Sequence, residues 1–166
     1  MIHLFGDSHA SDNAGWKDCS NIISHYKNST LCYSIGRDGL KRLDIRNYNI
    51  ENKDILIFCY GEIDCRCHVK KHVNKNISYQ KIIDNIINKY FSIIKLNIEI
   101  SKLDVTVCVY NVPPPVHGFK VEHSFGFIGT DNERKQYHLY FNNKLKEKCE
   151  EYGYIFFDIY DKYCDD

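Results

Sequence analysis

The chain consists of short apolar runs separated by longer segments with helical periodicity. Five runs have the length of a β-strand, at residues 2–6, 30–35, 54–60, 105–112 and 154–159. The run at 54–60 is almost continuously apolar, which is typical of a strand covered on both faces. These runs predict a five-stranded sheet in the interior of the protein.

Two long segments between the runs are predicted to be helices. From Ser78 to Ile100, isoleucines and aromatic residues recur at three- and four-residue steps and form one stripe. The second helix begins at the capping box of residues 130–133 and ends at Gly153. Residues 11–27 are predicted to form a loop and a short helix, and a further helical stretch is expected after Gly36.

The alternation of strands and helices predicts right-handed β-α-β crossovers and an all-parallel sheet. We therefore expect one α/β domain over residues 1–166, built as a three-layer α/β/α sandwich with a five-stranded parallel sheet. The sequence contains no internal repeat and no linker-like segment.

Composition narrows the function classes. The 22 basic and 22 acidic residues balance, which argues against a nucleic-acid partner. No apolar run is long enough to cross a membrane, and the first predicted strand starts at Ile2, without room for a signal peptide. We expect a cytoplasmic protein with reduced cysteines. Cys65-x-Cys67-His68 has no second Cys/His pair, and no Gly-rich phosphate loop is present, so we expect no metal and no cofactor.

The candidate chemistry lies at the predicted strand ends. The first strand is followed by Gly6-Asp7-Ser8-His9, the second by Gly36, and the third by residues 61–68. Parallel strands bring their carboxyl ends to one edge of the sheet, where ligands bind. A serine there becomes a nucleophile if a base takes its proton and donors stabilise the oxyanion. The alternative is that Gly-Asp-Ser is only a turn with a helix cap.

With these motifs, the sequence resembles the SGNH (GDSL-like) hydrolase family. The residues that carry the resemblance are Phe5-Gly6-Asp7-Ser8, Gly36 and Gly61-Glu62-Ile63-Asp64. The resemblance implies a flavodoxin-like fold and acyl-ester hydrolysis or acyl transfer, often on carbohydrates. It also implies that Ser8, preceded by Asp7, is the nucleophile and that the N–H groups of Ser8 and Gly36 bind the oxyanion.

One departure from the family concerns the oxyanion hole. Ile63 stands where the family has an asparagine, and its side chain cannot donate a hydrogen bond. Arg66 and His68 are the nearest replacements. Arg66 is suited either to an anionic substrate group, such as a carboxylate or a sugar-nucleotide phosphate, or to an ion pair with Glu62 or Asp64. The residues expected to line the substrate site are Gly61, Glu62, Asp64, Arg66, His68 and His9.

A second departure concerns the base, because the chain contains no Asp-x-x-His. Three explanations remain open. The histidine belongs to a longer parent protein, which we favour. Alternatively, an internal histidine has taken the role, either His117 or His123 after the fourth strand or one of the nearby His68 and His9. The third explanation is that the site is inactive. The sequence thus favours a serine esterase or O-acyltransferase acting on a small-molecule or glycan substrate. The alternative is an inactive glycan-binding or scaffolding module of a larger protein.

Overall fold

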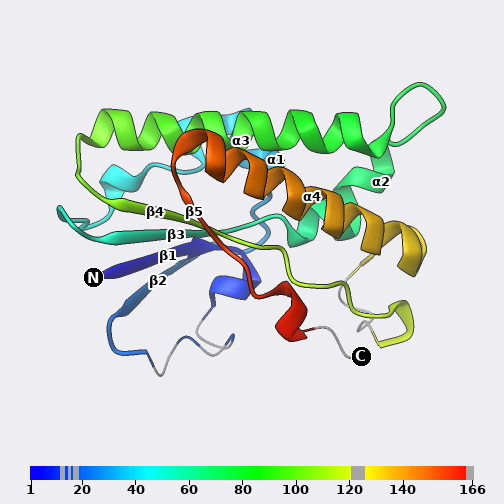
Figure 1. Ribbon diagram of the computed structural model, residues 1–166, viewed down its shortest axis with the longest axis horizontal. Coiled ribbons are helices and arrows are strands. Elements are labelled where there is room, and N and C mark those ends of the chain that lie inside the picture. Colours follow the sequence, from blue (N-terminus) through cyan, green and yellow to red (C-terminus); the bar gives the residue numbers. More distant parts are fainter. Residues whose placement is uncertain (12–13, 15, 17–18, 121–125, 164–166) are drawn as a thin grey trace.

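The computed structural model describes residues 1–166 except 12–13, 15, 17–18, 121–125 and 164–166. Its five strands form one parallel sheet in the order β2-β1-β3-β4-β5 (Figure 1). This confirms the predicted five-stranded α/β fold. The strands are β1 (Ile2–Gly6), β2 (Ile22–Tyr26), β3 (Ile55–Cys59), β4 (Thr106–Tyr110) and β5 (Ile155–Phe157).

Both long helices lie where the periodicity predicts them. The helices are α1 (Cys32–Asp38), α2 (Val69–His72), α3 (Tyr79–Ser101) and α4 (Asp131–Tyr152). Helix α4 starts at the Thr130–Glu133 capping box and ends at Gly153, whose φ of 69° is left-handed. No helix in the described part of the chain is long and apolar enough to cross a membrane. The short helical turns include η1 (Ser8–Ala10), η6 (Asp64–His68), η7 (Gly118–Lys120) and η8 (Tyr160–Tyr163).

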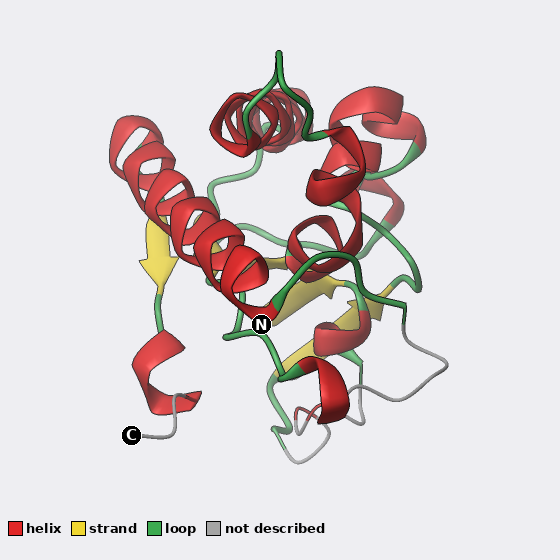
Figure 2. Ribbon diagram, turned by 90° about the vertical axis from the view of Figure 1, so that its right-hand side faces the viewer, coloured by secondary structure: helices red, strands yellow, loops and turns green. Residues whose placement is uncertain are grey.

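The two faces of the sheet are covered unequally. Helices α1, α3 and α4 lie on one face, over the larger apolar cluster that includes Phe58 and Phe91 (Figures 1 and 2). The other face carries a smaller cluster around Leu4 and Ile57, covered in part by Trp16 and Ile159. The three helices over the larger cluster therefore form the thicker layer of the molecule, and they are the helices that reach the carboxyl edge of the sheet.

The second strand differs from the sequence prediction. Residues 22–26, within the segment expected to be a loop and short helix, form β2, whereas the apolar run at 30–35 leads into α1. The physical reason is a distant carboxylate. Buried Asp64 accepts hydrogen bonds from the N–H groups of Cys32 (2.7 Å) and Tyr33 (3.1 Å) and so caps the start of α1.

This correction moves Gly36 away from the strand ends. Gly36 lies inside α1, where an added Cβ would come within 2.7 Å of the Lys89 Cβ on α3. Its absent side chain lets the two helices pack closely, so the expectation that it ends the second strand and binds the oxyanion is wrong. The segment that follows β2 at the carboxyl edge is instead residues 27–31, because the Lys27 N–H donates to the Gly6 carbonyl at 2.9 Å.

Candidate active site

Ser8 lies at the start of a tight turn directly after β1. Gly6 permits this turn, because an added Cβ there would lie 2.4 Å from the Ala10 Cβ and 2.7 Å from the Cys59 carbonyl oxygen. Asp7 caps the turn by accepting the His9 N–H at 3.1 Å. Ser8 is exposed, and neither its Oγ nor its N–H is hydrogen-bonded to another described residue. The turn therefore presents both groups outward.

Asp7 and His9 form an acid–imidazole pair on either side of Ser8. The Asp7 carboxylate is buried, with 1% exposure, and its Oδ1 lies 3.1 Å from His9 Nδ1. Burial lowers the pKa of His9, but the hydrogen bond and negative charge of Asp7 outweigh it and raise that pKa above its ordinary value. The bond to Nδ1 leaves Nε2 available for proton transfer.

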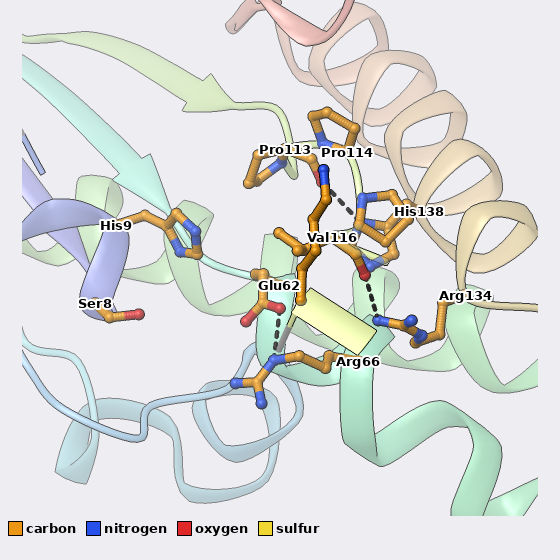
Figure 3. A pocket seen from close by; sticks show the side chains of 11 residues that line it. Ser8, His9, Glu62, Arg66, Pro113, Pro114, Val116, Arg134 and His138 are labelled. Carbon is orange, nitrogen blue, oxygen red and sulfur yellow. Dashed lines mark hydrogen bonds and ion pairs between the residues drawn. The ribbon is translucent and has the colours of Figure 1, made fainter. Parts of the chain in front are cut away.

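Ser8 and His9 line a cavity of about 320 Å³ at the carboxyl edge of the sheet. Its opposite walls come from η6, the segment after β4, and the first turns of α4 (Figure 3). The cavity brings together predicted residues and residues that the sequence analysis did not single out. The lining residues are Ser8, His9, Glu62, Arg66, Pro113, Pro114, Pro115, Val116, Lys120, Arg134 and His138.

The segment after β3 contributes Arg66 to this cavity, in an ion pair with Glu62. Gly61 has a φ of 122°, and a Cβ there would lie 2.7 Å from the Phe141 ring, so only glycine fits. Arg66 Nε donates to Glu62 at 2.6 Å, as the ion-pair interpretation predicted, and its Nη1 donates to the Gly126 carbonyl. Gly61 and Asp64, both expected at the substrate site, do not line the cavity. Burial raises the pKa of Asp64 to about 7.

The predicted histidines fall in different places. His68 packs between the rings of Tyr33 and His72, at centroid distances of 4.2 and 4.5 Å, and does not line the cavity with Ser8. His117 lines a neighbouring cavity of about 460 Å³ and pairs with Asp131. His123 lies outside the described residues. Of the predicted histidines in the described part of the chain, His9 shares the cavity with Ser8.

Arg134 and His138 are the main residues missed by the sequence analysis. Both are on α4, four residues apart, and each is only 1% exposed. They continue the buried stripe formed by Tyr137, Phe141 and Leu145. Two basic side chains on a mostly apolar buried face were the signal that a polar site lies beneath this end of the helix.

The segment Cys65-x-Cys67-His68 is a candidate metal motif in the described part of the chain. No group of three or more His, Cys, Asp or Glu side chains there is arranged to hold a metal ion. Cys65 is buried, while the thiol of Cys67 donates to the Gly126 carbonyl at 2.7 Å. The Cys65-x-Cys67-His68 segment thus helps to anchor the loop beside the cavity.

Comparison with known proteins establishes the fold. No protein-family model matches the sequence, and no curated protein matches it. Among solved structures, a Bacteroides fragilis protein described as an acylhydrolase has a TM-score of 0.63 at 12% identity, with 99% of this chain and 70% of that chain covered. Phospholipase A1 from Streptomyces albidoflavus has a TM-score of 0.52 at 12% identity, with 96% and 79% covered.

A third solved structure has a similar fold. A member of the lipolytic G-D-S-L family from Veillonella parvula has a TM-score of 0.51 at 9% identity, with 96% of this chain and 78% of that chain covered. The chain therefore has the fold of GDSL-type hydrolases, as the SGNH resemblance implied.

Proposed function

We propose that this protein is a serine-dependent acyl-ester hydrolase or acyltransferase. The observation that carries the proposal is the placement of exposed Ser8 beside the Asp7–His9 pair, in one cavity at the carboxyl edge of the sheet. The fold shared with an acylhydrolase and a phospholipase A1 supports it.

In the proposed reaction, His9 is the base. The proton of the Ser8 hydroxyl passes to His9 Nε2 as Ser8 Oγ adds to the acyl carbon and the carbonyl electrons move to oxygen. Collapse of this intermediate expels the alcohol, which takes the proton from His9. Water or an acceptor hydroxyl then attacks the acyl-enzyme through the same base, releasing an acid or a new ester. Asp7 orients the imidazole and stabilises its charged form.

Two oxyanion donors are assigned, one from the Ser8 turn and one from η6. The Ser8 N–H is not hydrogen-bonded to another described residue, so it is available to the developing charge. Ile63 offers no donor, and we assign the second position to the Arg66 guanidinium, which lines the cavity and is oriented by Glu62. A cationic donor is suited to an anionic oxygen.

The cavity also limits the substrate. Pro113, Pro114, Pro115 and Val116 form an apolar wall for the acyl group. A volume of about 320 Å³ is at the small end for a ligand site, which favours an ester with a short acyl group such as acetyl. The remaining walls are polar, which is consistent with a hydroxylated alcohol. We therefore propose a carbohydrate-linked acyl ester.

The test is to replace Ser8 by alanine and measure hydrolysis of 4-nitrophenyl acetate and labelling by a fluorophosphonate. We expect Ser8→Ala to lower kcat/KM by at least about 10³-fold and to abolish labelling. Ser11→Ala is the matched control, because it removes a hydroxyl of the same loop whose one hydrogen-bond partner among the described residues is the Ser8 carbonyl, at 2.8 Å. It should stay within about threefold of the wild-type protein.

The opposite outcome is equally clear. A wild-type protein without esterase activity or labelling, or a fully active Ser8→Ala variant, would exclude the proposal. The absence of a side-chain donor at Ile63 would then favour the inactive glycan-binding module.

A further inference from the structure

The cavity that contains Ser8 has an excess of positive charge. Arg66, Lys120 and Arg134 line it, against one lining carboxylate, Glu62, which is paired with Arg66 at 2.6 Å. The chain as a whole has equal numbers of basic and acidic residues. Positive charge is therefore concentrated where a substrate would bind.

Arg134 is the most unusual of these cations because its side chain is only 1% exposed. Its Nη1 donates to the Val116 carbonyl at 2.9 Å, its Nη2 pairs with Asp131, and the Phe127 ring lies 4.6 Å from the guanidinium carbon. Its Nε has no hydrogen-bond partner among the described residues. Burying a guanidinium with an unsatisfied N–H is costly, so this donor needs an acceptor from outside the described residues.

His138 lies one turn further along α4 and lines the same cavity (Figure 3). Its Nδ1 is 2.7 Å from the Pro113 carbonyl, which only accepts, so Nδ1 carries the proton. Burial lowers the pKa of His138 to about 4, and the ring is neutral. Its Nε2 is therefore an acceptor, and it has no partner in the described part of the chain.

We propose that Arg134 and His138 form a subsite for an anionic group that has a hydroxyl beside it. The Arg134 Nε–H would donate to a carboxylate or phosphate oxygen, and His138 Nε2 would accept from the neighbouring hydroxyl. A sugar acid and a sugar phosphate both present this pair of groups. The subsite deepens the proposed function, on which it rests, by placing the negative charge on the alcohol part of the ester.

The test is calorimetric titration with D-glucuronate, glucose 6-phosphate and neutral D-glucose. Both anions should bind at least about tenfold more tightly than glucose, and their ratio separates a carboxylate-specific from a phosphate-specific subsite. Arg134→Gln should weaken anion binding at least tenfold. Lys135→Gln is the matched control, since it removes the same charge from the next residue, which is exposed and lines the neighbouring cavity. It should change the affinity less than twofold.

Two further measurements keep the outcomes distinct. If Arg134→Gln does not fold, as judged by circular dichroism, His138→Phe replaces it. That variant keeps the ring but loses the acceptor, and it should weaken glucuronate binding severalfold. Equal affinity for glucose and the two anions in the wild-type protein would overturn the subsite. Ser8→Ala removes the proposed nucleophile but neither subsite residue, so it should bind glucuronate normally. A wild-type protein that binds anions but hydrolyses no ester would refute the proposed function and leave the anion subsite standing.

Discussion

Each of two neighbouring cavities is lined by a histidine that pairs with an aspartate in nearly equal geometry. His9 Nδ1 lies 3.1 Å from Asp7, and His117 Nδ1 lies 3.0 Å from Asp131. Their surroundings differ: the Asp7 side chain is 1% exposed, whereas that of Asp131 is 46% exposed. A similar hydrogen bond therefore joins a buried charge in one pair and a solvated charge in the other.

The partners of the two carboxylates explain what each pair does. Asp7 holds the turn that presents Ser8, and its negative charge acts on one imidazole. Asp131 receives hydrogen bonds from His117, the Gly118 N–H and Arg134, which together lower its pKa to about 2. The exposed pair thus anchors a loop and shares its charge among three donors, while the pair with the buried carboxylate is suited to acid–base chemistry. Neighbours and burial, not bond length, distinguish them.

The largest expected effect comes from exchanging the two histidines in turn for glutamine. His9→Gln should lower kcat/KM for 4-nitrophenyl acetate by roughly 10³-fold, because the base is lost while the shape of the turn is kept. His117→Gln should stay within about threefold. Steady-state kinetics on both variants decides the matter. Loss of activity in His117→Gln with His9→Gln intact would assign the base to the exposed pair instead.

Much of the fold was predictable from the sequence because its signals are local. The apolar run that became β3, the stripe of α3 and the capping box of α4 each lie within one stretch of chain. The prediction of the second strand was wrong because the interaction that decides this region is not local. The run at 30–35 looks like a strand, but Asp64, distant in sequence, satisfies the N–H groups of Cys32 and Tyr33 and favours a helix.

The candidate site was likewise predictable only where its residues have a local signal in the sequence. Ser8 could be located because glycine, aspartate and serine follow an apolar run directly, and Glu62 and Arg66 because they follow the strongest strand. The role of His9 depends on a carboxylate whose burial is a tertiary property. The positions of Arg134 and His138 depend on how α4 packs over the sheet, which periodicity alone does not fix.

A smaller effect should appear in the pH dependence. Because Asp7 raises the pKa of His9, and the base must be neutral, kcat/KM should rise with pH through a pKa above 6.5. Asp7→Asn removes the negative charge, so the remaining activity should show this limb at lower pH. The pH–rate profile of Asp131→Asn serves as the control and should keep the wild-type limb. An unchanged limb in Asp7→Asn would show that another group is titrating.

The smallest effect is expected for the stability of the exposed pair. His117→Ala should change the free energy of unfolding by less than about 1 kcal/mol, because solvated ion pairs contribute little. Asp7→Ala should cost about 1–2 kcal/mol, since it removes the cap of the Ser8 turn. Urea unfolding of both variants measures the difference. A loss above about 2 kcal/mol in His117→Ala would mean that the exposed pair is a major anchor of the fold, so that solvent exposure does not separate the two pairs energetically.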